Sequence, residues 1–341
     1  MEPPALLPLT RVLVPTDLSP RAEAAVDFAV RLAAPDGAEV VLLHVFAFPY
    51  DWYHWPSETL TGLRKHVERE AEGRLAALAQ RKTTPAVRVR PHLVVRTDVA
   101  SAVHATADDV GADLVVMGTR GWAGERPALG GVTAQVVRRA RRPVLAVPRA
   151  AAVPEGPPPG APPVDGPPVG GPPVGRVVVP VDGSEAAAEA LRVGHALATS
   201  RGVPLLVFHV AGEEALGGET WGGEAVEAAD APLLGAYERR VRRFAEGALR
   251  GDADGDADGG ADVRLTFAGG TAAGILDVAD AADLLVLAPH RTGHVTEDVL
   301  ARAPCPVLVL PARRGGAPEP HDRRHASPPA AGRHPDLAPA F

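Results

Sequence analysis

The chain has 341 residues, 46% of them hydrophobic, which is enough for two domains of roughly 150 residues that each bury a core. The formal net charge is −7 with both signs mixed along the chain, which argues against a broad surface for nucleic acid or anionic membranes. The only cysteine, Cys305, excludes an intrachain disulfide framework. Residues 1–9 lack a basic signal segment and no apolar run is long enough to span a bilayer, so we expect a cytoplasmic protein without membrane or nucleic-acid partners.

In the first half, short runs of Val and Leu alternate with longer amphipathic stretches. This is the pattern of a parallel sheet with helices on both faces. Ser19 followed by Pro20 predicts the start of the first helix, as an N-cap and a proline at the first helical position. The next helix carries one apolar stripe, made of Val67, Ala71, Leu75 and Leu78. Strands are predicted near 11–16, 39–46, 87–94, 113–118 and 143–148.

The second half repeats the first after a stretch made almost entirely of Pro, Gly, Ala and Val. RVLVPTDLSPRAEAAVDFAVRLA at Arg11 to Ala33 is echoed by RVVVPVDGSEAAAEALRVGHALA at Arg176 to Ala198, and Ser184 repeats the capping serine. Further on, ADLVVMG matches ADLLVLA, and RRPVLAVP matches APCPVLVLP. The predicted parts are a first domain at 1–149, a linker at 150–175, a second domain at 176–312 and a disordered tail at 313–341.

A glycine-rich segment follows the predicted strand at 113–118 and leads into a helix. Ligands of open α/β sheets bind at the carboxyl ends of the strands. Gly118 and Gly121 would let backbone amides approach a phosphate without a Cβ in the way, and Gly131 would open the helix whose first amides receive it. The alternative is a tight turn with no ligand.

The spacing of these glycines resembles that of the universal stress protein family. Its ATP-binding members carry Gly, two residues, Gly, nine residues, then Gly followed by Ser or Thr, and Gly118, Gly121 and Gly131 match this spacing. Val132 stands where the family has Ser or Thr, and the hydroxyl comes one place later, in Thr133. The resemblance covers both halves and implies two Rossmann-like domains of the adenine nucleotide alpha hydrolase-like type. Each would be a five-stranded parallel sheet with helices on both faces, and the two would pack as a pseudo-two-fold pair.

The resemblance implies ATP as the ligand of the first domain, with Mg²⁺ as a further candidate. It assigns to the adenosine pocket Pro15, Thr16, Asp17 and Val45. It assigns to the phosphate end Met117, Gly118, Arg120, Gly121, Gly131, Val132 and Thr133. The Asp17 carboxylate can accept a ribose hydroxyl or help hold hydrated Mg²⁺. The alternative is that it only caps the helix that begins near Ser19.

The corresponding loop of the second half is shorter, and the glycine spacing of the first half is replaced there. This half keeps Asp182, Gly183 and Ser184, but Ala288 and Pro289 stand where the first half has Met117 and Gly118. Because proline has no amide to donate, we predict that the second half does not bind ATP in the family manner. For His290, Arg291 and His294 we favour solvated loop positions over an anion site.

Three functions remain open. The favoured one is an ATP-binding stress-response or regulatory protein, in which the nucleotide changes the conformation or partner surface of the tandem pair. The others are a nucleotide-independent interaction protein and a slow ATPase, for which only Asp17 is available as a general base. No catalytic motif for covalent, zinc or P-loop chemistry is present, and the acidic run at 252–262 lacks the Glu of a calcium loop, so no metal site is predicted. The resemblance also implies pairing of the last strands, Val144 to Val147 beside Val307 to Leu310, within one chain or in a homodimer.

Overall fold

A computed structural model of the chain describes residues 6–47, 57–119, 129–148, 174–211, 220–221, 224–225, 233–249, 262–288 and 294–312. The predicted tail, and the predicted linker up to residue 173, lie outside the described residues. We call the elements from β1 to β5 copy 1 and those from β6 to β12 copy 2. No helix in the described part of either copy is long and apolar enough to cross a membrane.

Copy 1 is a parallel sheet with the strand order β3-β2-β1-β4-β5. Its strands lie where the apolar runs predict them: β1 (Arg11–Pro15), β2 (Glu39–Phe46), β3 (Val89–Val95), β4 (Leu114–Gly118) and β5 (Val144–Val147). Its helices are α1 (Pro20–Ala33), the short 3-10 helix η1 (Ala34–Asp36), α2 (Ser57–Lys82), α3 (Val99–Asp109) and α4 (Gly131–Arg138).

Copy 2 repeats this arrangement with the strand order β10-β7-β6-β11-β12. The strands are β6 (Arg176–Pro180), β7 (Leu205–Ala211), β10 (Asp262–Phe267), β11 (Asp283–Leu287) and β12 (Val307–Val309). The helices are α5 (Glu185–Arg201), α6 (Leu233–Leu249), α7 (Thr271–Val278) and α8 (His294–Arg302). A separate antiparallel pair, β8 (Thr220–Trp221) with β9 (Glu224–Ala225), has no counterpart among the described residues of copy 1.

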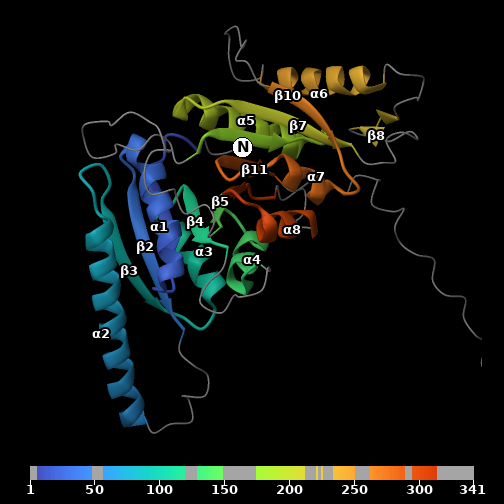
Figure 1. The fold of residues 1–341 in the computed structure, drawn as a ribbon. Helices are drawn as coiled ribbons and strands as arrows, with labels where there is room; N and C mark the ends of the chain where they lie inside the picture. The colour runs from blue at the N-terminus through green and yellow to red at the C-terminus, as the bar shows by residue number, and fades with distance from the viewer. Residues whose placement is uncertain are drawn as a thin grey trace, which may run out of the picture.

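The two copies join edge to edge into one ten-stranded sheet (Figure 1). β5 and β12 run antiparallel, and Leu145 lies opposite Leu308, the residue at the same place in copy 2. A pseudo-two-fold axis therefore passes between these two leucines. This confirms the predicted α/β fold with two parallel halves, and the predicted contact between the last strands.

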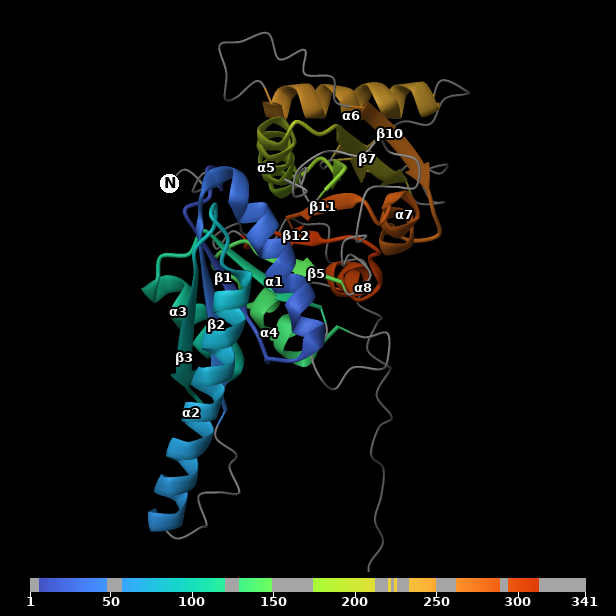
Figure 2. The same cartoon turned by 60° about the vertical axis from the view of Figure 1, so that its left-hand side comes forward.

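Two apolar cores cover the two faces of the sheet, and each core draws on both copies. One contains α1, α2, α5 and α6, with Phe28 and Leu191 among its fully buried side chains. The other contains α3, α4, α7 and α8, with Val103 and Leu300. Figure 2 shows the junction strands lying between these helical layers. The hydrophobic effect therefore holds the copies together as well as folding each one.

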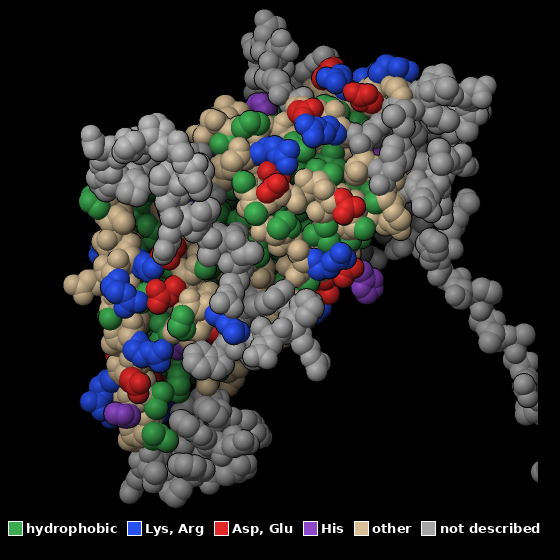
Figure 3. All heavy atoms as spheres, in the orientation of Figure 1, with side chains coloured by type: hydrophobic (Ala, Val, Ile, Leu, Met, Phe, Trp, Pro, Cys, Tyr) green, Lys and Arg blue, Asp and Glu red, His purple; other side chains and the backbone are tan. Residues whose placement is uncertain are grey.

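The helix starts follow the predicted local chemistry. Ser19 Oγ accepts a hydrogen bond from the Ala22 amide at 3.2 Å, and Ser184 Oγ accepts one from the Ala187 amide at 3.1 Å. The predicted stripe of α2 is also confirmed, because Ala71, Leu75 and Leu78 are buried and Val67 is half-buried. The N-terminal part of α2, before this stripe, extends beyond the sheet (Figure 2). On the face drawn in Figure 3, acidic and basic side chains are interspersed.

Candidate functional site

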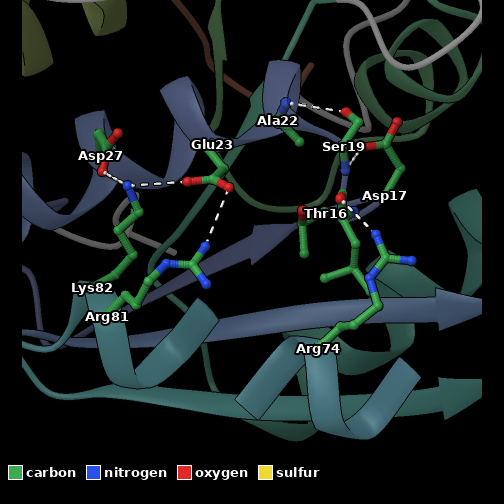
Figure 4. Close-up of polar contacts among 10 residues, drawn as sticks. Thr16, Asp17, Ser19, Ala22, Glu23, Asp27, Arg74, Arg81 and Lys82 are labelled. Atoms are coloured by element: carbon green, nitrogen blue, oxygen red, sulfur yellow. Dashed lines mark hydrogen bonds and ion pairs between the residues drawn. The ribbon is translucent and has the colours of Figure 1, made fainter. Parts of the chain in front are cut away.

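The turn between β1 and α1 has an unusual backbone. Leu18 has φ 59°, a left-handed conformation that costs free energy for any residue other than glycine. Two local hydrogen bonds hold it: the Leu18 amide donates to Thr16 Oγ1 at 3.1 Å, and the Ser19 amide donates to Asp17 Oδ1 at 2.9 Å (Figure 4). Copy 2 has Gly183 at the same place, with φ 82°. The turn is thus a shared feature, but only copy 1 makes it with a strained residue.

Asp17 is exposed at the end of β1 and also stabilises this turn. Its Oδ1 accepts the Ser19 amide, and in copy 2 Asp182 Oδ1 accepts the Ser184 amide at 3.0 Å. The N-cap of α1 is Ser19, so Asp17 supports the turn before the helix, and Asp182 does the same before Ser184 in copy 2. A carboxylate has two oxygens with several lone pairs, so accepting the Ser19 amide does not by itself exclude a ligand role for Asp17.

Arg74 contacts this turn, and sequence reasoning missed it. It lies on α2, and its Nη2 donates to the Leu18 carbonyl at 3.2 Å. Figure 4 shows its guanidinium directed from α2 toward the turn that carries Thr16 and Asp17. In the sequence, only one feature hints at this contact: Arg74 is next to Leu75, and the apolar stripe of the helix predicts that Leu75 packs into the core. Arg74 brings a positive charge to the strained turn.

A histidine fixes the ends of the two neighbouring strands relative to each other. His44 Nδ1 lies 2.8 Å from the Thr16 carbonyl, and the Thr16 amide donates to the Leu43 carbonyl at 2.8 Å. Val45, the next residue, is half-buried at the same edge. Copy 2 repeats the contact, with His209 Nδ1 at 2.7 Å from the Val181 carbonyl.

The second of these histidines makes stability depend on pH. Burial lowers the pKa of His209 from the usual 6.5, although the hydrogen bond to Val181 and the charge of Asp182 partly offset this. Below pH 6.5, His209 is therefore protonated to a greater extent in the unfolded chain than in the native chain. Protonation then favours the unfolded state, so the free energy of unfolding falls as the pH falls. We expect urea unfolding at about pH 7.5 and about pH 5.5 to show this loss, and His209→Gln to reduce it. An unchanged pH dependence in the variant would contradict the assignment.

The other side of the site is the end of β4 and the start of α4. Met117 is buried and Gly118 is half-buried. The Gly130 amide donates to the Thr119 carbonyl at 2.9 Å, and α4 begins at Gly131. The first amides of a helix have no partner within the helix, so this end carries donors and a partial positive charge. Arg120 and Gly121 lie outside the described residues.

Thr133 fastens α4 to β4. Its hydroxyl is buried and donates to the Gly118 carbonyl at 2.9 Å. Val132, at the position where the family has Ser or Thr, has 40% of its surface exposed. This end of α4 therefore offers a ligand backbone amides and the Val132 methyl groups, while the Thr133 hydroxyl is engaged within the protein.

Copy 2 has the same helix start, in a register that the sequence comparison missed. Gly-Gly-Val-Thr at the start of α4 (Gly130 to Thr133) aligns without a gap with Gly-His-Val-Thr at the start of α8 (Gly293 to Thr296), and the alignment continues into the last strand. Thr296 is buried like Thr133, and Val295 is 40% exposed like Val132. The buried threonine is thus a shared structural device, whereas the residue that opens the helix differs: Gly131 in copy 1, His294 in copy 2.

The structure brings those predicted site residues that it describes to the carboxyl ends of the strands of copy 1. β1 lies between β2 and β4 in the sheet, so Pro15, Thr16 and Asp17 stand between Val45 on one side and Gly118 on the other. The chain reverses its direction of winding between β1 and β4, and such a switch point is where open α/β sheets bind ligands. Neither metal nor thiol chemistry has support in the described part of the chain. No group of three or more His, Cys, Asp or Glu side chains there is placed to hold a metal ion. Burial raises the pKa of the Cys305 thiol to about 12, so it has no reactive thiolate.

Comparison with known proteins identifies the family. The chain matches the universal stress protein family over residues 8–148 and 173–311, and it belongs to that family. It is 30% identical to universal stress protein G of Shigella flexneri over 139 residues, which is 40% of this chain and 96% of that protein.

Solved structures agree on the fold. A universal stress protein from Archaeoglobus fulgidus is similar over 88% of this chain and 98% of its own, with a TM-score of 0.52 and 17% identity. The chain also has 29% identity to a universal stress protein solved in complex with cAMP, over 41% of this chain and 98% of that one, with a TM-score of 0.27.

Proposed function

We propose that this protein binds ATP at the carboxyl edge of copy 1 and acts as a nucleotide-dependent regulator in a stress response in the cytoplasm. The observation that carries the proposal is the meeting of two features at the β1–β4 switch point. These are the strained turn with Asp17, and the start of α4 at Gly131. Strained backbone persists only where the surrounding structure holds it in place, and such residues cluster at ligand-binding and active sites.

Each part of the edge suits one part of the nucleotide. The first amides of α4 would bind a phosphate, and a Cβ added at Gly131 would have nothing within 4 Å, so the backbone is open to a ligand there. Asp17 would accept a ribose hydroxyl, while Pro15, Thr16 and Val45 would contact the adenosine. Met117, Gly118 and Val132 would complete the wall toward the phosphates. Arg120 and Gly121 belong to the proposed phosphate loop by their place in the sequence, and Mg²⁺ would be held through the phosphates and water.

The proposal assigns one nucleotide to each chain. Copy 2 has His294 where copy 1 has Gly131, and Pro289 precedes it in a shorter loop. Copy 2 would then serve as the partner against which copy 1 is held. A homodimer through the last strands would require two chains to exchange copies, because β5 and β12 are already paired.

Calorimetric titration of ATP with Mg²⁺ tests the proposal, with Asp17→Asn compared against Asp182→Asn. Both variants alter the same turn contact, but only Asp17 lies at the proposed site. We expect one site per chain, and an affinity lowered about tenfold or more by Asp17→Asn alone. Equal effects of the two variants would mean that Asp17 only stabilises the turn.

No binding at millimolar ATP would overturn the proposal and favour an interaction protein that works without nucleotide. The exposed apolar side chain of Val132, in place of the hydroxyl of the family, is compatible with that function. Parallel titrations with cAMP and ADP would show which phosphates contribute. Phosphate release above that of a Gly118→Pro variant would indicate an ATPase.

A further inference from the structure

An ion pair between the two copies joins residues that occupy the same place in each copy. Asp36 ends η1 of copy 1, and Arg201 ends α5 of copy 2. Each lies the same number of residues after the arginine that begins its copy, Arg11 or Arg176. Each is followed by a glycine in the left-handed conformation, Gly37 with φ 65° and Gly202 with φ 64°. The pseudo-two-fold axis therefore brings equivalent positions together, but with opposite charges.

The pair is buried and bidentate. Arg201 Nη2 lies 2.6 Å from Asp36 Oδ2, and Nη1 lies 3.3 Å from Oδ1. The side chains are only 3% and 13% exposed, for Arg201 and Asp36 respectively. Nη2 also donates to the Leu32 carbonyl at 3.3 Å, and the Leu9 amide donates to Asp36 Oδ2 at 3.2 Å. Every hydrogen-bond partner that the described residues give to the Arg201 guanidinium thus belongs to copy 1.

A second cross-copy pair lies on the opposite face of the sheet. Arg138 of α4 meets Glu297 of α8, with Nε and Oε1 2.7 Å apart. In the alignment of the two helices, Arg138 corresponds to Ala301 and Glu297 corresponds to Ala134. The twofold-related contact therefore has no charges, and this pair too forms only when unlike copies meet.

We propose that these charges make the interface selective for unlike copies: copy 1 accepts copy 2 as its partner and rejects another copy 1. In a pairing of two copies 1, Asp36 would face a second Asp36 at the axis. In a pairing of two copies 2, Arg201 would face a second Arg201. Like charges that lose water without a counter-charge are strongly unfavourable, whereas opposite charges with good geometry offset their desolvation. The apolar strands β5 and β12 supply attraction, and the ion pairs decide which copy is attracted.

Single charge reversals in the full chain reproduce the two rejected pairings. Asp36→Arg places Arg opposite Arg201, as between two copies 2, and Arg201→Asp places Asp opposite Asp36, as between two copies 1. We expect each to lower the folding equilibrium constant in urea by about 100-fold or more. The double variant Asp36→Arg with Arg201→Asp restores an opposite pair, and we expect it to recover most of that loss.

The control is Arg81→Asp, which reverses an exposed charge that pairs with Glu23 at 3.3 Å within copy 1. This variant should lower the folding equilibrium constant by about fivefold or less. If both single variants fail to fold, a folded double variant still supports the proposal. A double variant whose loss equals the product of the two single losses, or that fails to fold as they do, overturns it.

Asp36→Asn and Arg201→Gln remove one charge without creating repulsion between like charges. We expect each to lower the folding equilibrium constant less than the charge reversal at the same residue. Equal losses would contradict selection by charge.

Discussion

Leu308→Ala should lower the free energy of unfolding by about 2–5 kcal/mol. Leu308 is buried at the centre of β12, opposite the equally buried Leu145 of β5, and both side chains enter the core that covers α1 and α5. Removing it leaves a cavity where the two copies meet, in a core that belongs to both. We therefore expect the native chain to unfold in one transition in urea, and the variant to unfold in one transition at a lower urea concentration.

Val295→Ala is the matched control for this substitution. Val295 is 40% exposed at the start of α8, so its truncation should change the free energy of unfolding by no more than about 0.5 kcal/mol. Leu145→Ala, the pseudo-symmetric substitution, should resemble Leu308→Ala in size. Two separate transitions, with Leu308→Ala shifting only one of them, would show that the cores fold independently and would contradict the shared core.

Thr133→Val should weaken both stability and the proposed nucleotide binding. The substitution keeps the shape of the side chain but removes the hydroxyl that donates to the Gly118 carbonyl at 2.9 Å. Losing the partner of a half-buried carbonyl costs about 1–3 kcal/mol. Because this bond holds the start of α4 against the end of β4, its loss also loosens the amides that the proposal assigns to phosphate. Urea unfolding and calorimetric titration of ATP measure the two effects.

Thr133→Ser keeps the hydroxyl and is the control for the loss of the hydrogen bond. Thr296→Val, in the same place of copy 2, is the control for position, since it removes a buried threonine hydroxyl at a residue that is not part of the proposed site. We expect Thr296→Val to lower stability without changing the affinity for ATP. If it weakens binding as much as Thr133→Val does, the effect on ATP comes from general loss of stability.

The fold could be predicted from the sequence because each copy follows strong local rules. Strands buried on both faces appear as continuous apolar runs, such as that at Val40 to Leu43, and Ser19 with Pro20 marks a helix start without any tertiary information. Internal repetition then supplied the second copy. The contact of the last strands followed from resemblance, since no local rule pairs Leu145 with Leu308.

The contacts that complete the site could not be predicted, because they join segments far apart in the chain. Arg74 reaches Leu18 from another helix, and His44 meets the Thr16 carbonyl only once β1 and β2 are paired. The left-handed backbone of Leu18 was missed as well, because leucine rarely adopts it and the only hint was Gly183 at the same place in copy 2. The register of Thr296 was present in the sequence, but it was missed because the two loops before it differ in length.

The antiparallel junction between β5 and β12 has a consequence for assembly. Joining the copies there consumes the strand edge of each one and leaves β3 and β10 as the outer strands of the sheet. Pro91 interrupts the hydrogen-bonding edge of β3, and Asp262 and Arg264 place charges on β10. These residues disfavour the pairing of a further strand with β3 or β10. The strand edges that could pair with another molecule, those of β5 and β12, already pair with each other inside the chain. The fold itself therefore opposes growth into larger sheets or fibres.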